Sequence, residues 1–210
     1  MAKPDHTWTG SSGHIHASLW DASGQHNLFA AHDGSAEMSD LMRWFLGGLM
    51  ACTRELALFI APNVNSYKRF AVASWAPVNI VWARDNRTCG FPHRRARQRA
   101  CASRTAFPGG DANPYLAFAA VLAAGLLRHR SLVFEPPPEF RGQRLPRHAA
   151  RPVSRARSTR PSPPGSESQV AREAFGEVVV AHYLNAARVE QSAFDAAVTD
   201  WERARYFERG

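Results

Sequence analysis

The chain has 210 residues, of which 45% are hydrophobic, so it can form one domain with a core or part of a larger domain. Its three cysteines have no CxxC spacing, which argues against a zinc ribbon or disulfide scaffold and indicates a reducing, cytoplasmic location. The first residues lack the apolar segment of a signal peptide, and no apolar run reaches the ~20 residues that cross a bilayer, so we predict a soluble protein without membrane contact.

The formal net charge of +8 comes from two segments. Pro92–Ala106 contains five arginines and no acid, and Arg141–Ser166 contains seven arginines and no acid. Without these two segments the net charge would be −4. A basic protein often binds nucleic acid or a membrane surface, but here the charge of the two segments needs an explanation before such a partner is inferred.

The N-terminal part of the chain predicts a strand, a turn and a helix. His14, His16 and Ser18 alternate with apolar residues, and this period of two is typical of a strand with one polar face. A turn is expected at 21–24. A helix is expected over 39–60, because a serine–aspartate pair can cap its start, apolar residues recur at helical spacing, and a proline follows its end.

The rest of the chain predicts one strand and three helices. The apolar run 78–83 is typical of a buried strand. The segment 112–127 is an apolar helix candidate that begins with an Asn-Pro pair. Two C-terminal helices are expected over 173–184 and 190–206. The sequence contains no internal repeat.

The sharpest local signal is the histidine pair in GSSGHIHAS. His14 and His16 are two residues apart on the predicted strand, so their side chains face the same way and can share a metal or phosphate site. Histidines at this spacing are also common on surfaces and in cores, and a small metal-binding barrel would need further ligands that the nearby sequence lacks. Arg87, taken alone, is equally well a surface residue.

Five motifs together are more specific than any one of them. In chain order they are GSSGHIHASLW (10–20), NVNSYKRF (63–70), APVNIVWARDNRTCGF (76–91), PGGDANPYLAFAAVLAAGL (108–126) and VTDWERARYFERG (198–210). Their order and spacing resemble the glutamine synthetase catalytic domain over most of 1–140 and about 169–210. The resemblance is strongest to the γ-glutamyl-amine (polyamine-type) ligases of that family. It implies an α+β fold: part of a curved, barrel-like antiparallel sheet with outer helices, followed by C-terminal helices.

The resemblance also implies roles for residues that contact glutamate and metal. Gly10 matches the glycine whose backbone contacts bound glutamate, and Arg69 matches the arginine that binds a glutamate carboxylate, for which a planar guanidinium is suited. His14 matches the histidine ligand of a catalytic Mg²⁺ or Mn²⁺, whose other ligands are carboxylates.

For ATP, the resemblance implies contacts with His16, Ser18 and Arg87. Arg87 is also the implied catalytic residue, because it matches an arginine that stabilises charge on the transferring phosphoryl group. The implied reaction is an ATP-dependent ligation. ATP phosphorylates the γ-carboxylate of glutamate, and ammonia or another amine then displaces phosphate from the γ-glutamyl phosphate.

Two departures from the family bear on the substrates. Ammonia-using members carry a glutamate that helps to bind ammonium, and Trp75 stands in its place here. Because an indole carries no negative charge, we expect an amine other than ammonia. Thr9 stands where many members have asparagine, which leaves that contact with glutamate open.

The sequence after NRTCGF departs from the family more strongly. At three places the family has an arginine for nucleotide phosphate, a metal-binding glutamate and a further substrate arginine. Here those places hold Pro92, Arg104 (or Ser103) and Ala106. The first and last have no charge, and arginine has the wrong sign for a metal ligand.

We hypothesise that a frameshift in a GC-rich gene explains these departures. In segments 92–107, 128–132 and roughly 143–168, codons read in a shifted frame permit family-like strings, and off-frame GC-rich codons yield arginine, alanine and proline. A barrel strand would then be missing at 92–107, which would leave an unpaired sheet edge. The alternative is a genuine disordered basic insertion, since such composition is typical of disorder.

These observations divide the chain into three parts. Residues 1–140 resemble the C-terminal part of the catalytic domain, 141–168 are a basic Pro/Arg/Ser-rich segment, and 169–210 are C-terminal helices of the same domain. The first residues resemble an internal part of the family sequence, so we expect an N-terminal part to be missing and the chain alone to be inactive. The family also implies a homo-oligomer with active sites between subunits.

A second function class is a non-enzymatic basic nucleic-acid-binding protein that uses the arginine runs. It would bind with a steep dependence on salt. Those runs lack interleaved aromatic residues and any known nucleic-acid fold motif, so the sequence favours the ligase and predicts no nucleic-acid partner.

The frameshift hypothesis predicts that resequencing of the gene will change the reading frame. We expect single-base differences around the codons for 92–107, 128–132 and 143–168, with a glutamate codon restored near position 104. Sequencing of genomic DNA across the codons for 85–170 is the measurement. An unchanged sequence would contradict the hypothesis and favour a genuine basic insertion.

Overall fold

The computed structural model describes residues 1–31, 33, 37–71, 76–93, 100–127, 135–141 and 168–208. In these ranges the helices are α1 (Asp40–Cys52), α2 (Ala57–Ile60), α3 (Val64–Tyr67), α4 (Pro114–Leu126), α5 (Gln169–Phe175), α6 (Glu177–Ala196) and α7 (Asp200–Tyr206). The strands are β1 (Ile15–Ala17), β2 (Trp82–Arg84), β3 (Phe91–His93) and β4 (Ser103–Thr105). None of the described helices is long and apolar enough to span a membrane.

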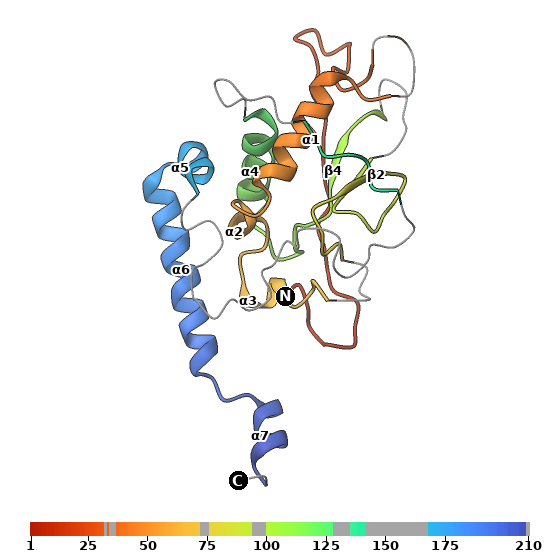
Figure 1. The fold of residues 1–210 in the computed structure, drawn as a ribbon. Coiled ribbons are helices and arrows are strands. Elements are labelled where there is room, and N and C mark those ends of the chain that lie inside the picture. Colours follow the sequence, from red (N-terminus) through yellow and green to blue (C-terminus); the bar gives the residue numbers. More distant parts are fainter. Residues whose placement is uncertain are drawn as a thin grey trace.

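The strands form two small sheets beside the helices, which confirms the predicted α+β class (Figure 1). β1 and β4 pair antiparallel, as expected for this sheet. β2 and β3 pair parallel, which corrects the expectation of a wholly antiparallel sheet. The link between them turns back at Asp85, whose φ of 52° is in the left-handed region, and so brings Phe91 beside Trp82. In the described part of the chain the strands do not close a barrel.

The predicted gap in the sheet at 92–107 is wrong, because β4 lies inside that segment and pairs with β1. Ser103 and Thr105 are buried, and Arg104 points to the other side. This alternation gives the three-residue strand one inward face. The frameshift itself stays a prediction. The segments 128–132 and 143–168, apart from Ser168, lie outside the described residues.

The core is built on the close packing of α1 against α4, which lie side by side in Figure 1. A Cβ atom added at Gly48 of α1 would lie 2.3 Å from the carbonyl oxygen of Ala124 in α4. The ring of Phe45 fills the space over Gly125 and contacts Phe29 at a centroid distance of 5.0 Å. Small residues therefore let the two backbones touch, while aromatic rings fill the volume around them.

The helix predicted over 39–60 is interrupted. It begins as expected, with the side chain of Ser39 accepting a hydrogen bond at the N-terminus of α1. After α1, the Thr53 hydroxyl donates to the carbonyl of Leu49 (2.6 Å), and the amide of Ala57 bonds three residues back instead of four. These bonds separate α2 from α1, because a threonine hydroxyl that bonds to the carbonyl four residues back competes with regular helix geometry.

The other predicted elements differ from the structure mainly at their ends. The helix at 112–127 is confirmed as α4, with the Asn113 side chain accepting from the amide of Tyr115 (3.0 Å) and Pro114 in the first turn. The strand expected over 78–83 starts later, as β2. The strand at the histidine pair is confirmed but is only three residues long.

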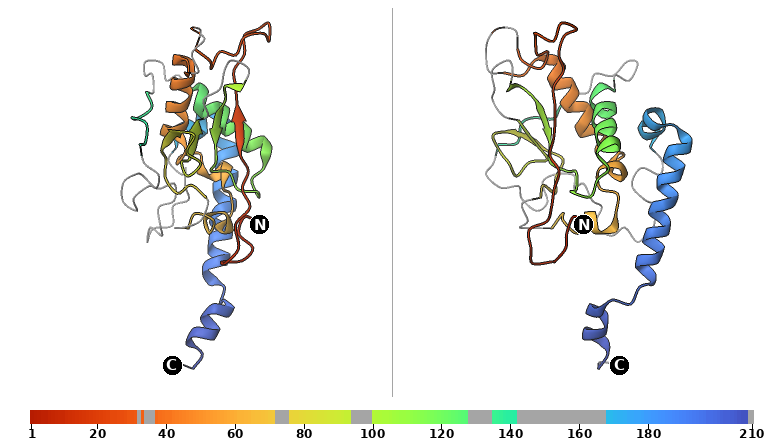
Figure 2. Two further views of the ribbon diagram at one scale, coloured as in Figure 1. Left: turned by 90° about the vertical axis from the view of Figure 1, so that its right-hand side faces the viewer. Right: turned by 180° about the vertical axis from the view of Figure 1, so that it is seen from behind.

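The C-terminal helices are divided differently from the prediction. α6 runs without a break through 185–189, where the sequence is rich in alanine, and the break falls instead before Thr199. Thr199 and Glu202 form a capping box that starts α7. α6 packs on the body through its first half, where Val180 and Leu184 are buried, and then extends past α3 (Figures 1 and 2).

Substitution Gly48→Ala is expected to destabilise the protein. Alanine in place of a helical glycine normally stabilises by about 1 kcal/mol. Here the added Cβ would meet a carbonyl oxygen at 2.3 Å, so the helices must separate, and we expect a net loss of about 2 kcal/mol. Urea unfolding would measure it.

The control is Ala51→Gly on the exposed side of α1, where only propensity acts and the loss should be about 1 kcal/mol. A Gly48→Ala protein that is more stable than the unsubstituted chain would show that α1 and α4 do not approach closely.

Candidate functional site

Two glycine-rich turns, 10–13 and 108–110, dock on each other beside β1. The amide of Gly13 donates to the carbonyl of Pro108 (2.9 Å), and the backbones of the two turns continue the pairing of β1 with β4. The first and fourth of the five sequence motifs are therefore neighbours in space. Hydrogen bonds between backbones hold this contact, so it depends on close approach and needs small residues.

Arg69 joins α3 to these turns. Its side chain is only 3% exposed, and its Nη2 donates to the carbonyls of Phe107 and Pro108, the latter at 3.1 Å. A Cβ atom on Gly10 would lie 2.8 Å from Arg69 Cγ, so only glycine fits there. Burial lowers the pKa of Arg69, and the charge of Asp111 acts in the opposite direction. The two residues expected to contact glutamate are thus brought together.

Asp111 ties the same region to the start of α3. Its carboxylate accepts hydrogen bonds from the Ser66 hydroxyl (2.9 Å) and from the side-chain Nδ2 of Asn63 (3.2 Å). Ser66 and Asn63 also form the capping box of α3. Arg69 lies two residues beyond the end of that short helix, so the capped helix and the carbonyls of the 108–110 turn together position its side chain.

The histidine pair lies on the outward face of β1, as the alternating pattern predicts. Ile15 and Ala17 pack toward the core, whereas His14 and His16 are exposed. Directly across from His16 in the sheet register is Arg104 of β4. The Nη2 atom of Arg104 lies 3.0 Å from Nδ1 and 3.2 Å from Nε2 of His14. A guanidinium group therefore covers the ring that was expected to bind metal.

This arrangement disfavours positive charge on the histidines. Burial and the charge of Arg104 lower the pKa of His14 and of His16. Burial lowers the pKa of Arg104 as well, and the charge of Arg87 adds to the shift. The face therefore combines fixed guanidinium charges with histidines that are neutral at pH 7, and a neutral ring nitrogen can accept the Arg104 hydrogen bond.

A divalent cation does not fit the residues around His14. Mg²⁺ and Mn²⁺ need several oxygen ligands, preferably carboxylates. The described residues contain no group of three or more His, Cys, Asp or Glu side chains that could hold a metal ion. The nearest charged group to the imidazole is the Arg104 guanidinium, which repels a cation.

The two other expected ATP contacts lie on nearby surfaces. Ser18 follows β1, and its hydroxyl accepts a hydrogen bond from the Trp20 indole (3.0 Å). Arg87 is exposed in the turn after β2, where the Asn86 side chain accepts from both the amide and the hydroxyl of Thr88. Trp75, the residue expected to shape the amine site, lies outside the described residues.

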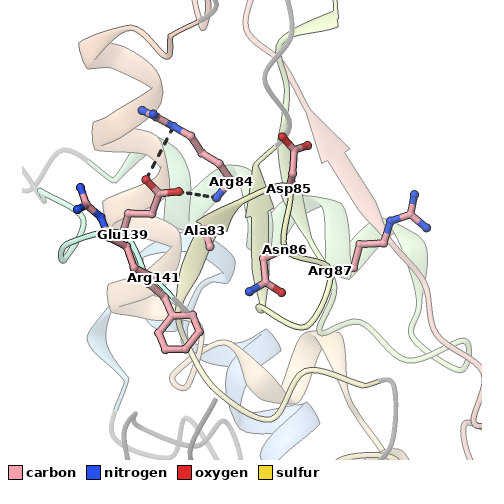
Figure 3. Close-up of a pocket in the computed structure, with 8 residues that line it drawn as sticks. Ala83, Arg84, Asp85, Asn86, Arg87, Glu139 and Arg141 are labelled. Carbon is pink, nitrogen blue, oxygen red and sulfur yellow. Dashed lines mark hydrogen bonds and ion pairs between the residues drawn. The ribbon is translucent and has the colours of Figure 1, made fainter. Parts of the chain in front are cut away.

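A shallow hollow next to Arg87 is lined by charged residues. Its lining consists of Ala83, Arg84, Asp85, Asn86, Arg87, Glu139, Phe140 and Arg141. Figure 3 shows Arg84 and Glu139 paired on one side, while the Arg87 guanidinium points away from them. Arg84 also forms an ion pair with Glu37. The charge of Arg84 is therefore compensated by ion pairs within the protein, whereas the Arg87 side chain points away from these acids.

Comparison with known proteins decides the family. The model of the glutamine synthetase catalytic domain matches residues 1–206, nearly the whole chain. The chain belongs to the glutamine synthetase family. This assignment confirms the resemblance inferred from the five motifs, and it leaves the nucleic-acid-binding alternative without support.

The relatives of this glutamine synthetase-family chain include enzymes named for organic amines. It is 46% identical over 202 residues to the gamma-glutamylethanolamide synthetase GlnA4 of Streptomyces coelicolor, covering 95% of this chain and 42% of the relative. It is 37% identical over 211 residues to the glutamate–isopropylamine ligase of a Pseudomonas species, covering 99% and 45%. The structure titled "Apo GmaS without ligand" matches with a TM-score of 0.80 and 28% identity, covering 99% and 47%. The chain thus spans about half the length of the relatives it matches.

The sequence did not reveal the contact between Arg104 and His14. The signal that could have found it is the Ser-Arg-Thr alternation of β4, which places a single charged side chain on the outward face of a strand. The pairing partner of β4 depends on tertiary structure, so the register with the histidine pair was not readable.

Substitution Arg69→Met is expected to lower the free energy of unfolding by about 2–4 kcal/mol, because the buried carbonyls of Phe107 and Pro108 lose their donor. Urea unfolding of both proteins measures the change. Arg43→Met is the matched control, because that arginine forms an exposed ion pair with Glu135 worth about 0–1 kcal/mol. Equal losses in the two variants would contradict a structural role for Arg69.

Proposed function

We propose that this chain carries part of the active site of an ATP-dependent ligase that joins the γ-carboxylate of glutamate to an amine. In the proposed reaction, a γ-carboxylate oxygen of glutamate attacks the terminal phosphorus of ATP and ADP leaves. The amine nitrogen then attacks the acyl carbon of γ-glutamyl phosphate, loses a proton, and phosphate leaves. Positioning and charge stabilisation are the main needs of the first step.

The observation that carries this proposal is the 46% identity to a gamma-glutamylethanolamide synthetase over 95% of the chain. The geometry supports it, because the residues assigned to glutamate lie together. Gly10 packs against Arg69, and both border the docked turns 10–13 and 108–110. His16 and Arg87 lie toward the outward face of β1, where we assign the phosphates of ATP.

We further propose that the amine is an organic amine instead of ammonia. Two relatives are named for ethanolamide and isopropylamine products or substrates, which fits Trp75 in place of an acid. An indole offers an apolar surface to an alkyl group but no negative charge for ammonium. This chemistry defines only the class of the amine. The amine is small, carries an alkyl chain and is neutral when it attacks.

ATP and a divalent metal ion are the cofactors proposed for the family reaction, and His14 would be a metal ligand by resemblance. In the chain as printed, the Arg104 guanidinium on His14 does not fit that ion, so we assign no step to a metal here. A homo-oligomer and a cytoplasmic location remain part of the proposal. Glutamate and the amine are its small-molecule partners.

Binding of the reaction product tests the function and the amine class together. Ligand-observed NMR with the purified chain is expected to detect γ-glutamylethanolamide, with an affinity at least about 3-fold higher than that of glutamine, because the hydroxyethyl group adds contact area. The α-linked isomer is the matched control ligand, since it has the same atoms and charge.

Three outcomes separate the alternatives. Preference for the γ-linked ethanolamide supports the proposal as a whole. Preference for glutamine over the ethanolamide would overturn the organic amine and keep the ligase. Equal signals from the γ-linked and α-linked isomers would overturn the glutamate site itself.

A further inference from the structure

Residues 2–11 form a loop whose two ends meet at the residues assigned to glutamate. The amide of Ser11 donates to the carbonyl of Ala2 (2.8 Å), and Ala2 is fully buried. A Cβ atom on Gly10 would lie 2.8 Å from that carbonyl oxygen and 2.8 Å from Arg69 Cγ. The base of the loop is therefore built directly on the Arg69 side chain, and the rest of the loop stands out from the body, in red beside the label N (Figure 1).

Lys3 fixes this loop from within. Its amide donates to Asn65 Oδ1 (2.8 Å) and its carbonyl accepts from Asn65 Nδ2 (2.9 Å), which ties the loop to α3. Its ammonium group donates to the carbonyl of Trp8. The carboxylate of Asp5 adds a local turn, because it accepts from the amide and the hydroxyl of Thr7 (2.8 and 2.6 Å). The backbone that leads to Trp8 is therefore anchored.

The Trp8 indole, in contrast, faces solvent. It is 65% exposed, and no described residue forms a hydrogen bond or a ring contact with it. Because Trp8 and Gly10 are two residues apart, their Cα atoms are separated by at most about 7 Å. An indole on an anchored backbone loses little conformational freedom when it makes a contact, since it has only two side-chain torsions. A ligand that contacts Gly10 therefore has an unused apolar surface within reach.

The chemistry of the ligand decides which of its groups can use this surface. A γ-glutamyl amide offers an α-ammonium group and the alkyl substituent on its amide nitrogen. The Arg69 guanidinium at the base of the loop repels a second cation, but it has no such effect on an alkyl group. An exposed indole attracts a cation only weakly in water, whereas every CH₂ group that it covers adds favourable burial. The alkyl substituent is therefore the better match.

We propose that Trp8 is a specificity-determining residue whose indole covers the alkyl substituent of the organic amine and of the γ-glutamyl amide made from it. The inference rests on the proposed function, which puts glutamate at Gly10 and Arg69. It deepens that function, because glutamine has only hydrogen on its amide nitrogen and leaves the indole uncovered. Trp8 supplies contact surface and takes no part in bond making or proton transfer.

The experiment is calorimetric titration of the full chain with γ-glutamylbutylamide, γ-glutamylethanolamide and glutamine. We expect Trp8→Ala to weaken binding of the butylamide at least 10-fold and of the ethanolamide about 3-fold, because the longer alkyl group loses more buried surface. Binding of glutamine should change less than 2-fold. Trp8→Phe should restore butylamide binding to within about 3-fold of the unsubstituted chain, because phenylalanine keeps an aromatic face.

Trp201→Ala is the matched control. Its indole is 63% exposed on α7, where its ring contacts are with Arg205 and Tyr206. This variant should change each affinity less than 2-fold. Circular dichroism of every variant establishes that it is folded.

The butylamide of glutaric acid, which lacks the α-ammonium group, separates the two groups that the indole could contact. Trp8→Ala should weaken its binding by the same factor as that of γ-glutamylbutylamide. An effect confined to ligands with the ammonium group would overturn the alkyl assignment in favour of a cation–π contact. Equal weakening of glutamine and the butylamide, no weakening at all, or the same losses in Trp201→Ala would each remove the specificity role.

The outcome is separable from that of the product-binding test. If the unsubstituted chain prefers the γ-linked ethanolamide while Trp8→Ala changes nothing, this inference fails and the proposed ligase stands. If the unsubstituted chain binds none of these ligands, the proposed function fails and this inference fails with it.

Discussion

The buried guanidinium of Arg69 is the interaction on which the site depends. It satisfies the carbonyls of Phe107 and Pro108 and leaves room only for glycine at position 10. Through these contacts, three stretches that are far apart in sequence are held within one hydrogen-bond network. A buried charge is costly unless its donors are used, so the surrounding backbone must adopt the conformation that uses them. These contacts thereby position the turns 10–13 and 108–110.

The two faces of the β1–β4 pair have different roles: the inward residues of β4 shape the fold, and its outward residue sets the chemistry of the surface. Ser103 and Thr105 face inward and close the sheet against the core, and this would happen with almost any outward residue between them. The outward position opposite His16 then decides the character of the site. With arginine there, the face carries guanidinium charge against an imidazole. A change of one residue type at that position changes which ions the face can attract, while the fold is kept.

Local signals predicted several elements well. Asn113 and Pro114 fix the start of α4, since they satisfy or remove the amides that a helix leaves unpaired, and Ser39 does the same for α1. The break after α1 was not predicted, because the threonine back-bond at Thr53 competes with a helix by a small margin. The break between the C-terminal helices was predicted at 185–189, but it lies before Thr199. An alanine-rich sequence continues a helix wherever packing does not stop it.

The sequence by itself determined the family and the outward face of the histidine pair, and it is the source of the proposal that particular residues contact glutamate and ATP. These properties depend on motif order and on the period of a strand, which are local. Only the tertiary structure decided that β4 exists, that it pairs with β1, and that Arg104 therefore lies on His14. Strand pairing joins residues about ninety positions apart, and its register follows from packing of both strands on a shared core, which no local pattern records.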